Sequence, residues 1–221
     1  TAAAALGWTF VGWSGEHSGT ENPTTLSIEG DMTVNATFSE GGQATTVTYQ
    51  VAASSDDAEE RLDRNTVALK GVDLELGADK APQIVGLRFA NVSVPPGATV
   101  TGAYLEFWAD ELHGDQTDLV LQAQASDNAE AFGSGDGDLS GRPRTIEYAA
   151  WSDVEPWTEV HAAYQSTDVS AVVQEVVSRP GWTAGNALVI LVTGTGRRTA
   201  ESYNGAPDLA PKLHVSYVGG N

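Results

Sequence analysis

The chain has 221 residues, a net charge of −19, 41% hydrophobic residues and no cysteine. This hydrophobic content predicts a packed core and argues against global disorder. The negative charge excludes nucleic acid as a partner, because a phosphate backbone needs a basic surface, and it argues against anionic membrane surfaces. No apolar run reaches the roughly 18 residues of a membrane span, so no membrane insertion is expected. The charge favours cations as partners, or it serves solubility in salty surroundings.

Residues 1–40 form a distinct first segment, with five acidic residues and no lysine or arginine. In the run 32–38, apolar residues alternate with threonine and asparagine, which is typical of a strand with one buried face. Residues 1–6 lack the basic start and cleavage context of a signal peptide, and we expect them to be the end of a strand. The segment is predicted to be a small β-module.

Three stretches of this segment carry a family resemblance: 7–15 (GWTFVGWSG), 22–24 (NPT) and 31–38 (DMTVNATF). They resemble the second half of the internalin-type B-repeat, also called the Listeria–Bacteroides repeat, which occurs in tandem in bacterial surface proteins. The resemblance implies a partial repeat that acts as a spacer or adhesive β-module. Trp8 and Trp13 are expected in its core rather than on a ligand-stacking surface.

Residues 41–45 are expected to be a flexible linker, because they are rich in glycine and polar residues. Short apolar runs separated by turn residues then predict an all-β, jelly-roll-like antiparallel β-sandwich over residues 46–221. The expected strands are 46–51, 66–77, 83–91, 99–109, 117–125, 186–194 and 211–218.

One short helix is expected in this sandwich, because five valines between residues 169 and 177 follow the i, i+3, i+4 spacing of a helix face. Thr167 or Asp168 can cap its start, and Arg179 and Pro180 end it. Residues 126–160 are rich in glycine, aspartate, serine and tryptophan, and they are expected to form a long surface loop.

Residues 54–60 contain the densest group of carboxylates, four within five residues. Carboxylates this close repel one another unless they are solvated or neutralised. Calcium takes about six to eight oxygen ligands and tolerates irregular geometry, so calcium is the expected cofactor. The expected metal ligands are Asp56, Asp57, Glu59, Glu60, Asp73, Glu75 and Glu201. The alternative is a solvated acidic turn with Arg61 and Arg64 as counter-ions.

A second resemblance rests on stretches of residues 44–220: 55–60 (SDDAEE), 73–76 (DLEL), 84–89 (IVGLRF), 94–100 (VPPGATV), 181–182 (GW), 185–188 (GNAL) and 200–205 (AESYNG). They resemble a carbohydrate-binding-module-like β-sandwich domain of large secreted proteins of marine and environmental bacteria. The resemblance implies a jelly-roll fold, structural calcium, a secreted or cell-surface location, and attachment to proteins that act on polysaccharide.

Carbohydrate binding needs aromatic faces that stack on sugar C–H surfaces, together with polar groups that bond hydroxyls. The candidate ligand-binding residues are Trp108, Tyr104, Trp151, Trp157 and Tyr203, with Tyr164 a further aromatic candidate. Trp151 and Trp157 flank an acidic loop at 152–156. The alternative for each tryptophan is a half-buried anchor at the surface.

No enzyme is expected. The four histidines are scattered without metal-site spacing, and the chain has no nucleophile elbow. Asp110 and Glu111 could in principle cleave a glycoside, but acidic pairs are common in this chain. Two functions stay open: a calcium-stabilised module that binds polysaccharide, or a structural subunit of a bacterial cell-surface, filament or matrix assembly. In the second case the partners are neighbouring surface-protein subunits, which pair through open strand edges.

Overall fold

A computed structural model describes residues 1–5, 8–40, 42 and 44–219. The chain divides into two compact units, Thr1–Ala44 and Thr45–Asn221. Of the linker expected at 41–45, residues 41 and 43 lie outside the described residues, and Thr45 is the first residue of a strand. Residues 1–5 are not in a strand, so the expectation for the start of the chain is wrong there, and Leu6 lies outside the described part.

The first unit is built on two antiparallel strands, β1 (Trp8–Gly15) and β2 (Val34–Glu40). The ring of Phe10 packs against Trp13, with centroids 5.1 Å apart, and against Phe38, with centroids 5.8 Å apart. Trp13 is part of this aromatic cluster, as expected. Trp8 is 48% exposed, so its predicted place in the core is wrong.

The smaller sheet of the second unit has the order β11-β8-β14-β3, and its strands pair antiparallel. The bounds are β3 (Thr45–Gln50), β8 (Thr99–Trp108), β11 (Ala163–Gln165) and β14 (Lys212–Val218). Successive side chains point to opposite faces of a strand, so the buried residues of β8 alternate with half-buried polar and aromatic ones. The smaller sheet therefore has one core face and one outer face.

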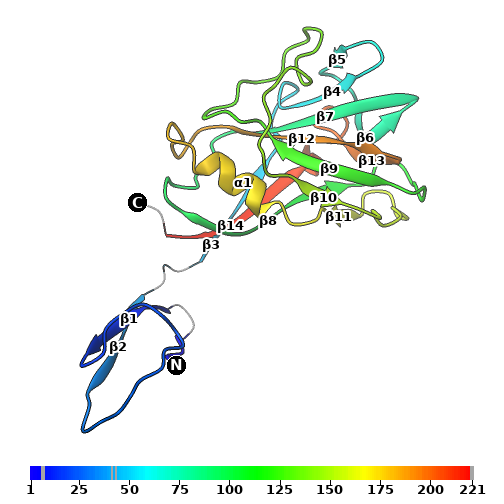
Figure 1. Ribbon diagram of the computed structural model, residues 1–221. Helices are drawn as coiled ribbons and strands as arrows, with labels where there is room; N and C mark the ends of the chain where they lie inside the picture. Colours follow the sequence, from blue (N-terminus) through cyan, green and yellow to red (C-terminus); the bar gives the residue numbers. More distant parts are fainter. Residues whose placement is uncertain (6–7, 41, 43, 220–221) are drawn as a thin grey trace. The chain divides into compact units, whose positions relative to one another are not determined.

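The larger sheet follows the order β10-β9-β12-β7-β4-β5, and β6 pairs with β7 and with β13. Its strands are β4 (Asp57–Arg61), β5 (Thr66–Ala68), β6 (Asp73–Asp79), β7 (Ala81–Phe89), β9 (Asp118–Ala123), β10 (Ala149–Trp151), β12 (Leu188–Thr195) and β13 (Arg197–Glu201). Every pairing in this sheet is antiparallel. Figure 1 shows the larger sheet and the smaller sheet together in the second unit.

The main core lies between the two sheets. Leu105 and Phe107 of β8 belong to one buried cluster with Leu87 and Phe89 of β7. Burying each such side chain contributes about 1.5–3 kcal/mol to folding. The helix α1 (Ser170–Val177) adds its valines to this cluster and lies against β8 and β9, as can be followed in Figure 1.

A second buried cluster lies on the opposite face of the larger sheet. Ile84 of β7 belongs to it, whereas its neighbour Val85 faces the main core. Phe132 and Leu139 of the long connection after β9 are 4% and 0% exposed in this second cluster. The surface loop expected over residues 126–160 is therefore wrong: much of this segment covers the larger sheet, and it also contributes β10.

The all-β antiparallel sandwich with one short α-helix is confirmed for the part of the chain that the structure describes. Several details differ. The strand expected at 66–77 is divided between β5 and β6, and the acidic run 57–61 is the strand β4 itself. The strands β10, β11 and β13 were not predicted. The start of α1 also differs in detail: its N-cap is Val169, and the Asp168 carboxylate accepts a hydrogen bond from Ser170 N at 2.6 Å.

Candidate functional site

The four carboxylates of the acidic run face different surroundings. Asp56 pairs with the guanidinium of Arg88 at 2.6 Å, and both side chains are largely buried. The Oδ2 atom of Asp57 accepts a hydrogen bond from Tyr203 N at 2.7 Å. Two of the expected metal ligands therefore already have partners within the protein.

Glu60 is fully buried, and it faces the connection that covers the larger sheet. Its Oε2 atom accepts hydrogen bonds from Leu139 N and Ser140 N, each at 2.8 Å. No described residue bonds its Oε1 atom. Glu60 thus holds this connection against β4, and the described structure places it apart from the acids of the opposite face.

Glu59 and Glu75 form a close carboxylate pair. Glu59 Oε1 accepts hydrogen bonds from Glu75 N at 2.6 Å and from Gln83 Nε2 at 2.9 Å. Burial, together with the neighbouring Glu75, raises the pKa of Glu59 to about 9. This pair therefore retains a proton at neutral pH.

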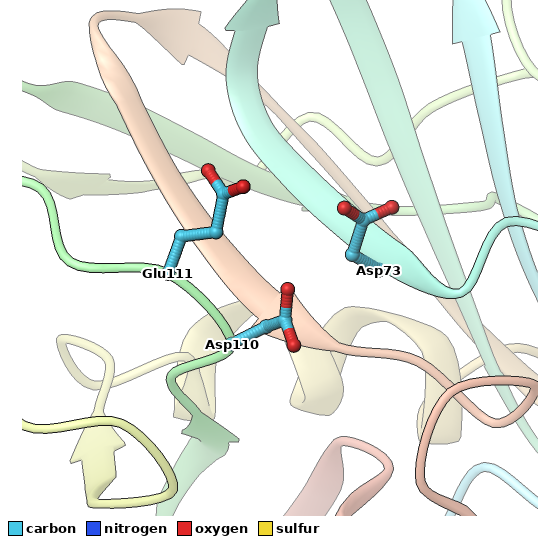
Figure 2. Close-up of side chains that lie close together, drawn as sticks. All are labelled: Asp73, Asp110 and Glu111. Carbon is cyan, nitrogen blue, oxygen red and sulfur yellow. The ribbon is translucent and has the colours of Figure 1, made fainter.

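Three other acids lie close together in space. One carboxylate oxygen each of Asp73, Asp110 and Glu111 lies within 4.8 Å of the other two. Figure 2 shows these side chains, one from the start of β6 and two from the turn that follows β8. We call these three residues the carboxylate triad.

The backbone of β13 brings the triad together. On one side β13 pairs with β6, where Glu201 is opposite Asp73. On the other side Asp110 N donates a hydrogen bond to Thr199 O at 2.9 Å. The end of β8 and the start of β6 are thus the two neighbours of β13, and their acids meet over it.

The triad is an electrostatically unfavourable arrangement as it stands. Burial raises the pKa of Asp73, and Glu75, Asp110 and Glu111 raise it further. Arg197 lies 3.5 Å from the Glu111 carboxylate, and His113 lies 3.1 Å from it. These neighbours compensate Glu111 in part.

Glu201 lies beside the triad and is 4% exposed. Burial and the nearby Asp110 raise its pKa, whereas His161, 3.0 Å from its Oε1 atom, opposes that shift. The region as a whole has more carboxylates than counter-ions, so binding a cation there would be favourable.

The donor set of the triad suits calcium. Calcium takes oxygen ligands from carboxylates, backbone carbonyls and water, and each carboxylate can supply one or two of the roughly six to eight oxygens required. The triad includes Asp73 from the expected ligand set, and Glu75 and Glu201 lie next to it. Asp110 and Glu111 were not expected as ligands, although their position just past a predicted strand end was a usable signal.

A different kind of surface covers the outer face of the smaller sheet. Tyr104 stacks on His214, with ring centroids 4.6 Å apart and an interplanar angle of 12°. Lys212 Nζ lies 4.4 Å from the centroid of the Trp108 ring. Two of the predicted ligand-binding aromatics, Tyr104 and Trp108, therefore share one face with cationic and polar neighbours.

A hollow of about 260 Å³ lies on this outer face, beside the Tyr104–His214 stack. Small residues form much of it, because Gly102 of β8 lies opposite Ser216 of β14. The residues that line the hollow are Thr46, Gly102, Ala103, Tyr104, Gln165, Ser166, Asp168, His214 and Ser216. The alternation of residues 212–216, polar outside and apolar inside, was the sequence signal for this face.

The other aromatic candidates lie elsewhere. Trp151 and Trp157 are 8% and 1% exposed and belong to the main core, so their expected role as surface contacts is wrong. Tyr164 stacks on Trp157, with ring centroids 4.9 Å apart. Tyr203 is half-buried against the core near Asp57. The sequence could not reveal that Trp151 and Trp157 are buried, because the segment that contains them has no regular alternation of apolar and polar residues.

The geometry defines a two-unit, all-β protein with a polar–aromatic sheet face and a separate carboxylate triad. Residues 1–42 match the family model of the divergent InlB B-repeat domain. The match supports the predicted B-repeat, and it favours a surface or extracellular protein. It does not extend into the sandwich, whose likeness to carbohydrate-binding modules stays a prediction. No curated protein matches the chain.

Within the described residues, no helix is both long and apolar enough to cross a membrane.

Proposed function

We propose that the second unit is a non-catalytic module that binds polysaccharide on the outer face of the smaller sheet, within an extracellular protein. The observation that carries the proposal is the hollow beside Tyr104, which combines an aromatic ring with polar rim groups such as Gln165 and Asp168. Sugars are recognised by this combination, since their C–H faces stack on rings and their hydroxyls need hydrogen-bond partners. The B-repeat match supports the extracellular setting.

The test is affinity electrophoresis in gels that contain neutral or acidic polysaccharides. We expect retardation of the wild-type protein by at least one glycan and its loss in Tyr104→Ala. Tyr148→Ala is the matched control, because Tyr148 is 62% exposed and does not line the hollow. Unretarded wild-type protein across the whole panel, with no change in tryptophan fluorescence, would remove polysaccharide binding from the proposal.

Calcium is the second part of the proposal. We place it at the carboxylate triad, because Asp73, Asp110 and Glu111 offer three hard ligands, and the ion pair with Arg197 reaches only Glu111. Bound calcium would join the start of β6 to the end of β8, and so join the two sheets beside β13. The role is structural, and no catalytic step is assigned to the ion.

Calcium should stabilise the fold by mass action, since an ion that binds only the folded state adds about 2.7 kcal/mol at 100 times its Kd. We predict that chelator lowers the melting temperature of the wild-type protein and that added calcium restores it. The double variant Asp73→Asn/Asp110→Asn should melt at one temperature with or without calcium. Asp136→Asn, at an exposed acid away from the triad, should behave like wild type. If neither chelator nor calcium changes the melting temperature of the wild-type protein, this part of the proposal is contradicted.

A structural subunit is the alternative function, and the first unit favours it. In the described residues β2 pairs only with β1, so β2 has an open edge, whereas Trp13 N of β1 donates a hydrogen bond to Gly19 O at 2.8 Å. Trp8 and Val11 on β1 are 48% and 49% exposed. Light scattering with and without calcium separates the two functions: concentration-dependent assembly supports a subunit of a surface polymer, and a strict monomer supports the binding module.

A further inference from the structure

Gly102 lies inside β8, beside the register shift between Ser216 and Tyr217 of the paired strand β14. Its φ angle is outside the left-handed region, and a Cβ atom built on it meets no heavy atom within 4 Å. A glycine inside a strand weakens it and often marks a bulge, a tight bend or a place where a ligand or another backbone approaches closely. The missing side chain at Gly102 opens the floor of the hollow next to Tyr104.

We propose that the hollow above Gly102 is a subsite for one ring of a neutral sugar; this inference rests on the proposed polysaccharide binding. The ring lies over Gly102 and beside Tyr104, and its hydroxyls bond the polar rim. The volume of the hollow, about 260 Å³, is below the roughly 300–1,000 Å³ typical of sites for drug-sized ligands. It therefore suits a single ring better than a longer stretch of chain.

The rim provides free hydrogen-bonding groups on one side of the hollow. Among the described residues, the amide of Gln165 and the hydroxyl of Tyr104 have no hydrogen-bond partner, and Asp168 uses one oxygen for Ser170 N. Gln165 and Asp168 are both exposed. An amide, a phenol and a carboxylate oxygen can bond adjacent sugar hydroxyls as donor and acceptors.

Other lining groups are already engaged. Ser216 Oγ and Thr46 Oγ1 are 2.8 Å apart, and Ser166 Oγ donates a hydrogen bond to Thr167 O. They shape the hollow rather than bind the ring. Recognition therefore depends on the side of the hollow formed by Tyr104, Gln165 and Asp168.

The charges around the hollow select a neutral ring. Asp168 lines it, and no lysine or arginine does among the described residues. His214 in the wall bonds Thr48 Oγ1 through Nδ1 at 3.0 Å, and its Nε2 atom lies 3.6 Å from the Glu106 carboxylate. With a net charge of −19 on the whole chain, uronates and sulfated sugars meet repulsion at this subsite.

The experiment fills the hollow without disturbing the fold. Gly102→Val places a β-branched residue, which strands favour, where space is open. Gly135→Val is the matched control, because Gly135 has equally open space and lies outside the hollow. Gln165→Ala is a second variant that removes an exposed rim group. Binding to neutral and acidic polysaccharides is measured by affinity electrophoresis, alongside melting temperature.

We expect wild type and Gly135→Val to bind a neutral polysaccharide equally. Gly102→Val should lose at least about tenfold in affinity without a lower melting temperature, and Gln165→Ala should weaken binding several-fold. If Gly102→Val does not fold, the binding measured for Gln165→Ala tests the subsite in its place.

Wild-type binding that survives both Gly102→Val and Gln165→Ala would overturn the subsite while leaving the proposed function standing. Wild-type binding confined to acidic glycans would overturn the neutral-sugar assignment. Absence of wild-type binding to every glycan would overturn the proposed function and the subsite together.

Discussion

Asp57 shows what burial does to a single carboxylate in this protein. It is 3% exposed at the start of β4, and its contact with Tyr203 N offsets only part of the loss of hydration. Burial raises the pKa of Asp57 from its ordinary 3.8 to about 6, and the neighbouring Asp56 adds to the shift. The folded protein therefore binds this proton more tightly than the unfolded chain does.

The sign of the pH effect follows from that difference. The stabilisation from Asp57 is fully present below pH 3.8 and is lost as pH rises through about 6. A shift of this size corresponds to about 3 kcal/mol, as an order of magnitude. We predict that Asp57→Asn, whose amide oxygen can still accept from Tyr203 N, raises the free energy of unfolding at pH 7.5 by up to this amount.

Urea denaturation in chelator between pH 4 and 7.5 measures the effect without a contribution from calcium. The Asp57→Asn curve should be flatter than the wild-type curve, and Asp136→Asn should follow wild type. Parallel pH profiles for Asp57→Asn and wild type would contradict the assignment.

The metal ligands expected in the acidic run could not all be correct, because successive side chains of a strand point to opposite faces. The four neighbouring acids are all expected as ligands of calcium, which requires their side chains to converge on one side of the chain. In β4 alternate side chains point to opposite faces, so Glu60 faces Leu139 and Ser140 while Glu59 faces Glu75. Glu59 and Glu60 are therefore neighbours in the sequence but lie on opposite faces of the sheet. The triad depends on the pairing of β13 with β6, and no local sequence pattern predicts that pairing.

At the scale of elements, the connection after β9 acts as a cover for the larger sheet, and Gly86 makes this possible. A Cβ atom on Gly86 would lie 2.8 Å from Phe132 Cε1 and 3.0 Å from Leu139 Cδ2. The Phe132 ring thus packs directly on the backbone of β7. The guanidinium carbon of Arg142 lies 4.5 Å from the centroid of the Phe132 ring.

We predict that Gly86→Ala lowers the free energy of unfolding by about 1–3 kcal/mol, because the added methyl group overpacks this contact. In the double variant Gly86→Ala/Phe132→Leu the two effects should not add, since the smaller side chain leaves room for the methyl group. Gly102→Ala, in open space, is the control and should lose nothing. Additive losses in a double-mutant cycle measured by urea denaturation would contradict the proposed contact.

The elements themselves were predicted unequally from the sequence. The strand expected at 99–109 corresponds to β8, whose sequence alternates because one face is buried and the other is not. The connection 126–160 was misjudged, since its buried residues Phe132 and Leu139 are isolated among glycine and aspartate. Phe132 and Leu139 are buried only because they pack on the larger sheet, so their burial depends on the tertiary structure and not on a local pattern.

At the scale of the whole molecule, the buried clusters lie entirely in the second unit. Within the described residues, their members run from Val51 to Val215. The first unit has two strands, and an isolated two-stranded sheet is marginally stable in water. The stability of the chain is therefore expected to come from residues 45–221.

We predict that residues 45–221 expressed alone fold and melt within about 2 °C of the corresponding transition in the full chain, which is no more than the roughly 2–4 °C expected for a change of 1 kcal/mol. Calorimetry of both proteins at equal calcium gives the comparison. Retained glycan binding by the shorter protein is the functional control. A substantially lower melting temperature would show that the first unit contributes to the stability of the second.

The antiparallel pairing of β3 with β14 has a mechanical consequence. Thr45 lies opposite Tyr217, so the start of β3 and the end of β14 lie at the same end of the smaller sheet. Inter-strand hydrogen bonds run across the strands, so tension applied at these two residues would load the bonds one after another. The sandwich would open by peeling at low force rather than by shear. When the chain is stretched between these two residues, this unit would open from that end of the smaller sheet and lengthen the chain.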